Sequence, residues 1–302
     1  MRVNVARVWE DADYVKVKNM CDSNQGWNEV YKKKHVSVSI QSVPCSNYQM
    51  IKAEAKFTDV SANTVYDVLH DNTYRSHWDR HMAAQCFIGL INPNNDVGYY
   101  ALAAMPPIKG RDFDYPPMKG YVRGTALLSA YLIRPLDDEG CRIIYLSHSD
   151  PKGKPRNIPR ITGDEKMICG HSVCHQDYPP MKGYVRGTAL LSAYLIRPLD
   201  DEGCRIIYLS HSDPKGKLPT WLVNRLTRVI APKVIKRLHK ACMNYPSWKA
   251  ENQPGFKPWI YPEQQMDFPR VDLTKCQPQE YEQEIIDESS VVPTKEIEVD
   301  DD

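Results

Sequence analysis

The densest group of polar side chains lies in the stretch HDNTYRSHWDRH, which covers residues 70–81. His70, Asp71, His77, Asp79 and His81 could bind a metal ion. Their spacing matches no compact ligand motif, however, and no helical H-E-x-x-H pair is present. Solvated or capping side chains are the plainer interpretation of most of these residues.

A second group of possible ligands is CGHSVCH, from Cys169 to His175. Its Cys-x4-Cys spacing is wide, no second half of a zinc site follows, and alternate residues of a strand would face opposite sides. The chain has nine cysteines, an odd number without paired spacing, which we expect to be reduced thiols. We therefore predict neither a metal ion nor another cofactor.

Motifs for nucleophilic and nucleotide chemistry are missing. The 302 residues contain no G-x-S-x-G, G-x-G-x-x-G or P-loop motif. The sequence therefore favours a protein that is not an enzyme. A hydrolase that uses an internal cavity is the alternative, and it would need a nucleophile and a base inside that cavity.

The net charge of the whole chain is only +1, but acidic and basic residues are distributed unevenly along the sequence. Residues 214–250 carry nine Lys and Arg residues and no acid, whereas the segment from Glu280 onward has ten acids and one base. This arrangement favours contact with an anionic surface, and the acidic tail could mask the basic segment. Aromatic residues are not interleaved with the basic ones, so we predict no nucleic-acid partner.

Hydropathy argues against a membrane-embedded chain. The longest apolar run, residues 188–196, is shorter than the roughly 20 residues that a spanning helix needs. No apolar segment follows Met1, so we expect no secretory signal. The expected location is cytoplasmic, peripheral at membranes.

Hydrophobic periodicity predicts both helices and strands. We expect a short helix at 15–22, two strands at 30–42, a third at 48–57, a helix capped by Ser61, and strands at 84–90 and 97–105. A long helix is expected at 218–245, where Pro219 suits the first turn and Pro232 must kink or restart the helix. Its apolar side comprises Trp221, Leu222, Leu226, Val229, Ile230, Val234, Ile235, Leu238, Ala241 and Cys242.

These elements indicate an α+β fold, in which one curved antiparallel sheet wraps around the long C-terminal helix. Such a sheet encloses a space that either is filled by side chains or holds a ligand. We expect an N-terminal segment at 1–26, the folded domain at 27–250, and an acidic, disordered tail at 251–302.

A segment of 41 residues occurs twice without a difference, at 114–154 and at 177–217. Each copy contains a strand, a turn and a second strand (TALLSAYLIR, PLDDEG, CRIIYLSHS), and two copies do not make a solenoid. The repeat is either a recent duplication or an error in assembling the sequence. The second copy runs into the long helix, so we assign it to the domain and interpret residues 114–161 as a duplicated hairpin insertion. Because two identical hairpins could occupy the same position in the sheet, we expect either strand exchange or exposed strand edges.

Five stretches resemble a known family: LHDNTYRSHWDR, DVGYY, MPPIKGRDF, DPKGKLPTWLVN and KACMNYPSWK. Together they are similar to the START-domain lipid-transfer family, in its phosphatidylcholine-transfer-like branch, over about residues 27–263. The resemblance implies a helix-grip fold with a lipid tunnel between the sheet and the last helix. It also implies that the protein binds one phosphatidylcholine or phosphatidylethanolamine and shuttles it between membranes.

The resemblance also implies roles for single residues. Arg75 matches the position that holds the lipid phosphate and Asp79 its acidic partner, although an internal Arg–Asp pair would look the same. Tyr100 and Phe113 match aromatic positions around choline. A third aromatic position falls at Leu190, and the thinner cage should admit ethanolamine.

The C-terminal helix is expected to touch membranes transiently as a lid. Its contact residues would be Trp221, Arg225, Arg228, Lys233, Lys236, Arg237 and Lys240. In the tail, Ser289 and Ser290 are possible phosphorylation sites, although no acid stands three residues after either serine. If the insertion has destroyed transfer, the protein would act only through interactions.

Overall fold

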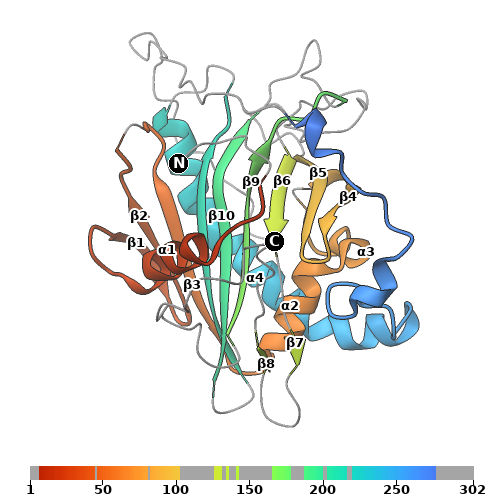
Figure 1. Ribbon diagram of the computed structural model, residues 1–302. Coiled ribbons are helices and arrows are strands. Elements are labelled where there is room, and N and C mark those ends of the chain that lie inside the picture. The colour runs from red at the N-terminus through yellow and green to blue at the C-terminus, as the bar shows by residue number, and fades with distance from the viewer. Residues whose placement is uncertain are drawn as a thin grey trace, which may run out of the picture.

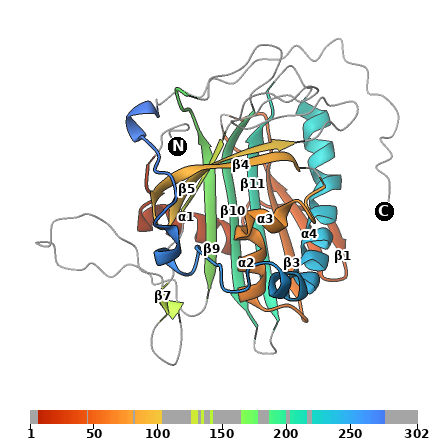
Figure 2. The same ribbon diagram turned by 90° about the vertical axis from the view of Figure 1, so that its right-hand side faces the viewer.

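A nine-stranded antiparallel sheet organises the part of the chain that the structure describes. The computed structural model describes residues 7–44, 46–80, 82–102, 126–130, 134–135, 141–142, 165–177, 187–199, 203–215 and 220–276. The strand order is β1-β2-β3-β11-β10-β9-β6-β5-β4. Helix α1 covers one face of the sheet, and α2, α3 and α4 lie on the other (Figures 1 and 2). The α+β fold with a long C-terminal helix is confirmed.

The boundaries of the elements follow the predicted order closely. In chain order they are α1 (Asp11–Asp22), β1 (Asn28–Lys33), β2 (Val36–Gln41), β3 (Met50–Phe57), α2 (Ala62–His70), α3 (Asn72–Arg75), β4 (Met82–Asn92), β5 (Asn95–Leu102), β6 (Ala126–Ala130), β7 (Arg134–Pro135), β8 (Cys141–Arg142), β9 (Lys166–Val173), β10 (Thr188–Pro198), β11 (Cys204–Asp213) and α4 (Thr220–Glu251). Ser61 caps α2 as expected, because its hydroxyl accepts a hydrogen bond from the Thr64 amide at 3.1 Å.

The two faces of the sheet carry different cores. On the face toward α4, called here the inner face, Ile168, Ile196 and Ile206 pack against α2 and α4. On the outer face, toward α1, a second cluster contains Trp9, Val17, Cys21, Met50, Met167, Cys169, Leu191, Ala193, Leu195, Ile207 and Leu209. Alternation along each strand separates the two sets, as expected for a sheet covered on both sides.

Both copies of the repeat contribute strands to this sheet. The second copy forms β10 and β11 as predicted, whereas the first copy forms β6, and β7 with β8 makes a separate two-stranded ribbon. β6 and β10 lie on opposite sides of β9 and pair with it in matching register, because Cys169 is opposite both Ala130 and Ala193. Most of residues 114–161 lies outside the described residues, so the insertion stays a prediction.

The long C-terminal helix differs from the expected one in two ways. It continues through Pro232 and Pro246 as a single element, so the alternative that the helix restarts at Pro232 is wrong. Val229, placed on the apolar side by periodicity, is 38% exposed. Among the described side chains of α4, the buried residues lie from Ala231 onward, except Leu222: they are Leu222, Ala231, Pro232, Ile235, Leu238, Ala241, Cys242, Tyr245 and Lys249.

Residues 252–276 form a strap that returns along the edge of the sheet. The Leu90 amide of β4 donates to the Pro269 carbonyl at 2.8 Å, and the Val271 amide donates to the Leu90 carbonyl at 2.9 Å (Figure 1). Two short 3-10 helices, Pro262–Gln265 and Leu273–Lys275, lie within the strap. The expectation of a disordered tail at 251–302 therefore does not describe residues 251–276, and residues 277–302 lie outside the described range.

Candidate functional site

Arg75 and Asp79, the residues expected to hold a phosphate group, lie next to each other. Helix α3 ends at Arg75, and one further turn of the chain leads to Asp79. The Arg75 Nε donates to Asp79 Oδ2 at 3.3 Å, and the Arg75 Cζ lies 5.4 Å from the centre of the Trp78 ring. The side chain of Arg75 is 26% exposed and that of Asp79 is 11% exposed. Arg75 and Asp79 therefore form an ion pair whose side chains are not completely buried.

A second ion pair fixes the helix that carries Arg75. Asp71 caps α3, and its carboxylate accepts hydrogen bonds from Lys249 Nζ at 2.9 Å and from the Tyr245 hydroxyl at 3.0 Å. Burial tends to raise the pKa of Asp71, but the hydrogen bonds from Lys249, Thr73 and Tyr245 outweigh it and hold the pKa below its ordinary value. α3 is therefore anchored on the last turns of α4.

Two tyrosines of the inner face lie close to the Arg75–Asp79 pair. Tyr194 of β10 and Tyr208 of β11 stack with their ring centroids 4.5 Å apart. Burial and Tyr208 raise the pKa of the Tyr194 hydroxyl, while Arg75 acts to lower it and Asp79 to raise it. The ion pair is therefore close enough to Tyr194 to influence it electrostatically.

Side chains of the inner face are less buried near this pair than those of the outer face. The outer-face residues Ala193 and Leu209 have no exposed surface. By contrast, four inner-face residues of the same central strands keep part of their surface exposed: Ser192, Tyr194, Tyr208 and Ser210. Farther along these strands Ile196 and Ile206 are fully buried.

The residues expected to surround choline are only partly within the described structure. The backbone of Tyr100 lies in β5 opposite Gln85, but the position of its side chain is outside the described part. Phe113 also lies outside the described residues. Leu190 is buried, at 7% exposure, within an irregularity in the pairing between β10 and β11. The aromatic cage remains a prediction.

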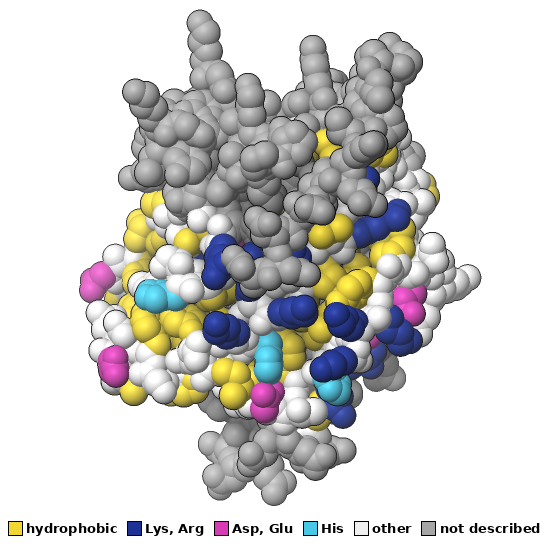
Figure 3. Space-filling view, turned by 180° about the vertical axis from the view of Figure 1, so that it is seen from behind, with side chains coloured by type: hydrophobic (Ala, Val, Ile, Leu, Met, Phe, Trp, Pro, Cys, Tyr) yellow, Lys and Arg dark blue, Asp and Glu magenta, His cyan; other side chains and the backbone are white. Residues whose placement is uncertain are grey.

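The face of the molecule that carries α4 shows basic and hydrophobic side chains side by side (Figure 3). Arg225, Lys236 and Lys240 are exposed, whereas Trp221, Lys233 and Arg237 are half-buried. Arg228 instead donates from Nη2 to the Gln49 side chain at 3.0 Å, which ties the N-terminal half of α4 to the start of β3.

The groups considered for metal binding have other partners or lie apart. His70 Nδ1 is 2.8 Å from the Tyr66 carbonyl, and burial lowers the pKa of His70 to about 4. His171 stacks on Trp9 on the outer face, with ring centroids 6.0 Å apart. His81 lies outside the described residues. Within the described ranges, no group of three potential ligands is placed to hold a metal ion.

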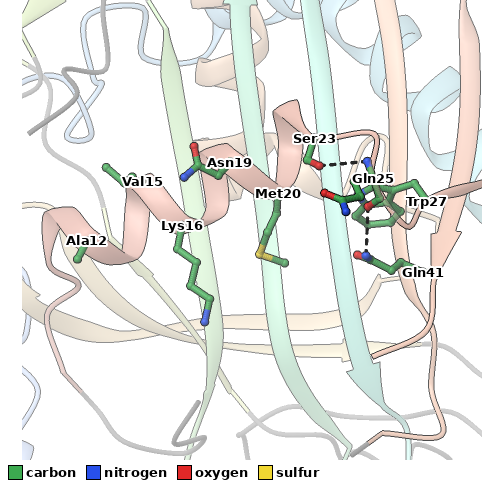
Figure 4. Close-up of a pocket in the computed structure, with 9 residues that line it drawn as sticks. All are labelled: Ala12, Val15, Lys16, Asn19, Met20, Ser23, Gln25, Trp27 and Gln41. Carbon is green, nitrogen blue, oxygen red and sulfur yellow. Dashed lines mark hydrogen bonds between the residues drawn. The ribbon is translucent and has the colours of Figure 1, made fainter. Parts of the chain in front are cut away.

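A separate hollow of about 490 Å³ lies beside α1, on the outer side of the sheet. Met20, Trp27 and Gln41 are among the residues that line it (Figure 4). Because the sheet lies between this hollow and the Arg75–Asp79 pair, the two are different places on the molecule.

Sequence reasoning missed the anchors of the site. Lys249 was counted only as part of the basic segment, yet its side chain is 8% exposed and bound to Asp71. Asp67 likewise binds Lys257 at 2.7 Å and Trp259 Nε1 at 2.8 Å, which holds the strap on α2. An available signal was FKPWIYPEQ, a stretch with three aromatic residues inside the segment taken to be a tail.

The fold agrees with the comparison with protein families. The START domain family matches residues 7–115, 114–158 and 155–249, and the chain therefore belongs to this family. Among the parts of the chain that the structure describes, no helix is both long and apolar enough to cross a membrane.

Individual relatives narrow the comparison. START domain-containing protein 10 of Mus musculus is 35% identical over 292 residues, which cover 96% of this chain and 86% of that protein. The phosphatidylcholine transfer protein of Rattus norvegicus is 22% identical over 59% of this chain and 66% of its own length. The crystal structure of human STARD10 aligns with a TM-score of 0.73 at 33% identity, covering 91% of this chain and 96% of that one. The chain is thus a START-domain lipid-binding protein homologous to STARD10.

Proposed function

We propose that the protein binds one phosphatidylcholine or phosphatidylethanolamine molecule and carries it between membranes. The observation that carries the proposal is the Arg75–Asp79 pair, which remains partly accessible over the inner face of the sheet. Burying a phosphate without a partner would cost several kcal/mol, so a lipid shuttle needs a cation inside. Arg75 meets that need, and the Asp79 carboxylate orients its guanidinium.

The choline group has no N–H and would depend on aromatic faces. Tyr100 and Phe113 are proposed for this role, and the aliphatic Leu190 in place of a third aromatic leaves room for ethanolamine as well. Both headgroups would then fit the same protein and give it a dual specificity.

The N-terminal half of α4 is proposed as the membrane-contacting lid. Trp221 and the basic residues listed above would draw it to anionic membranes, at about 1 kcal/mol per basic side chain near the surface. The weak burial of its first turns, residues 220–230, supports the proposal, because Val229 is exposed and Leu222 is the one buried side chain among those that the structure describes there. The protein would then be cytoplasmic and only transiently membrane-bound.

Native mass spectrometry and vesicle transfer test the proposal together. The purified chain should carry one phospholipid and should move labelled phosphatidylcholine between vesicles. Arg75→Met should reduce transfer at least tenfold while the protein stays folded. Arg80→Met is the matched control, because Arg80 is exposed and forms no side-chain hydrogen bond or ion pair among the described residues.

An empty, folded protein without transfer would contradict the proposal and favour the interaction-only alternative. Equal transfer by Arg75→Met and Arg80→Met would remove Arg75 from the phosphate site. Ester turnover that one point mutation abolishes would instead favour a hydrolase.

A further inference from the structure

A row of basic side chains follows one side of α4, and we call it the basic stripe. It consists of Arg225, Lys233, Lys236 and Lys240. At 3.6 residues per turn and 1.5 Å per residue, these positions fall within about 80° around the helix axis and over about 22 Å of its length. Arg225, Lys236 and Lys240 are exposed and form no hydrogen bond or ion pair among the described residues. Basic side chains accordingly gather on this face of the molecule (Figure 3).

The strap ends beside the C-terminal end of β9. The Gln176 amide donates to the Lys275 carbonyl at 2.8 Å. His175 and Cys276 form an isolated antiparallel bridge just beyond the strand. Residues 277–302, here called the acidic terminus, are therefore attached to the domain at this end of the sheet.

The first turn of α4 lies at the same end of the sheet. β9, β10 and β11 are consecutive antiparallel neighbours, so β9 and β11 run in the same direction and end at the same edge. β11 ends at Asp213, and α4 begins at Thr220. The end of the strap and the start of α4 both lie at the upper end of the molecule in Figure 2. Neighbouring strands are about 4.8 Å apart, so only about 10 Å separates β9 from β11.

Length and charge allow the acidic terminus to meet the basic stripe. Its 26 residues can span up to about 90 Å, far more than the separation of the two strands. From Glu280 onward it carries ten acids and one base, whereas residues 214–250 carry nine bases and no acid. Ile297 and Val299 stand among these acids, as the exposed Val229 stands among the bases of the stripe. The two segments are therefore complementary in charge and similar in their apolar content.

Another exposed basic group lies at the opposite end of the sheet. Lys32 and Lys33 end β1, at the turn that leads into β2. The other end of β2 is Gln41, which is opposite Met50 of β3. Met50 lies near the C-terminal end of β11, because the next residue of β3 is opposite a residue close to that end. Position in the sheet therefore favours the basic stripe over these lysines as the partner of the acidic terminus.

We propose that the acidic terminus binds the basic stripe of the same molecule and competes there with anionic membranes. The inference rests on the proposed role of α4 as the membrane-contacting lid, and it adds a regulator to that role. A membrane with enough anionic lipid displaces the acidic terminus and gains access to the stripe. A membrane without anionic lipid leaves the intramolecular contact in place.

Zero-length cross-linking tests the contact directly in the full-length protein. A carbodiimide forms an amide bond between a lysine amine and a carboxylate that it touches. Mass spectrometry should find such links between Lys236 or Lys240 and acids of residues 280–302. They should be lost in 1 M salt, where the Debye length falls to about 3 Å, and should decline when vesicles containing phosphatidylserine are added. Mixing isotopically labelled and unlabelled protein separates links within one chain from links between chains.

Vesicle binding tests the competition. A variant of the full chain replaces four acids of the acidic terminus by amides: Glu296→Gln, Glu298→Gln, Asp300→Asn and Asp301→Asn. Its affinity for vesicles of phosphatidylcholine and phosphatidylserine should rise about tenfold, because more basic side chains become available to the surface. Its affinity for vesicles of phosphatidylcholine alone should stay unchanged.

Two pairs of exposed lysines separate a specific contact from an effect of net charge. Lys236→Gln with Lys240→Gln removes two charges from the stripe, and Lys32→Gln with Lys33→Gln removes two charges at the far end of the sheet. Neutralising the acidic terminus should no longer raise vesicle affinity in the first background and should still raise it in the second. Circular dichroism checks that each variant is folded.

An equal rise in both backgrounds would overturn the proposal, because net charge alone would then explain the effect. Absence of links to the basic stripe, or links formed only between different chains, would also overturn it. Absence of lipid transfer by the wild type would overturn the proposed function, whereas the cross-linking result would still decide whether the acidic terminus contacts α4.

Discussion

Two ion pairs at the ends of α3, Asp71–Lys249 and Arg75–Asp79, differ in how far they are exposed to solvent. Asp71 and Lys249 are 3% and 8% exposed, and Tyr245 and Thr73 complete the hydrogen bonds of the carboxylate. Arg75 and Asp79 are 26% and 11% exposed. The comparison separates a buried pair that connects α3 to α4 from a more exposed pair, for which we propose a role in ligand binding.

Position in the fold explains this difference. Asp71 lies at the junction of α2, α3 and α4, where helix packing closes around it and leaves no room for a ligand. Arg75 is at the far end of the same short helix, so the first pair fixes the direction in which the second one points. Stability and ligand binding should therefore respond separately to mutation at the two places.

Lys249→Met should have the largest effect on stability. Removing the cation leaves Asp71 buried and uncompensated, and we expect the free energy of unfolding to fall by about 3–5 kcal/mol. Urea denaturation would measure this change, with Lys236→Met as an exposed control on the same helix. Similar losses in both variants would show that the Asp71–Lys249 pair contributes no more to stability than an exposed lysine does.

Arg75→Lys should affect transfer more than stability. Lysine keeps the charge but lacks the planar fork that binds two phosphate oxygens at once. We expect transfer to fall roughly tenfold, about 1.4 kcal/mol, with little change in the denaturation midpoint. A large loss of stability with normal transfer per folded molecule would make this pair structural like the first.

Tyr245→Phe should have a smaller effect, confined to stability. The variant removes one hydrogen bond to Asp71 and leaves the ion pair with Lys249 in place. We expect a loss of about 1–2 kcal/mol in the free energy of unfolding and unchanged lipid transfer. A selective fall in transfer would instead connect the Asp71 anchor directly with lipid binding.

Asp96→Asn in the lipid-free protein extends the comparison to an unpaired carboxyl group. Folding raises the pKa of Asp96 from 3.8 to about 7, so the folded state holds its proton more tightly over that interval. Its charge therefore lowers wild-type stability as pH rises from about 4 to 7.

The variant removes this cost, so its melting temperature relative to wild type should be higher at pH 8 than at pH 4. We expect the melting temperatures to differ by about 2–4 °C for each kcal/mol by which the ionised Asp96 carboxylate destabilises the folded wild type. Thermal denaturation at the two pH values checks the direction. A constant offset would show that the Asp96 pKa is not raised in the folded protein.

Local features of the sequence were enough to predict much of the fold. The Ser61 cap, the strand expected at 48–57 and the two strands of the second repeat copy depend on neighbouring residues, and the structure contains all of them. The Arg75–Asp79 contact is also local, because four residues span about one helical turn. The family resemblance supplied its proposed role.

The remaining features depend on residues far apart in the chain. Lys249 and Asp71 are separated by 178 positions, and no periodicity connects them. The side of the sheet that Asp96 occupies follows from the register of four strands, which the sequence alone does not set. The strap was mistaken for a tail because its contacts are individual hydrogen bonds to Asp67, Leu90 and Pro93, without a repeating pattern.

The matching pairing of β6 and β10 with β9 has a consequence for folding kinetics. A nascent β9 offers its two edges to two strands of identical sequence, and Cys169 faces an alanine whichever copy arrives first. Local side-chain pairing cannot tell the copies apart, so only the connections to β5 and α4 distinguish the correct strand order. Chains that pair the wrong copy must separate the strands again before they can fold, and refolding should therefore show a slow phase whose amplitude falls when one copy is altered.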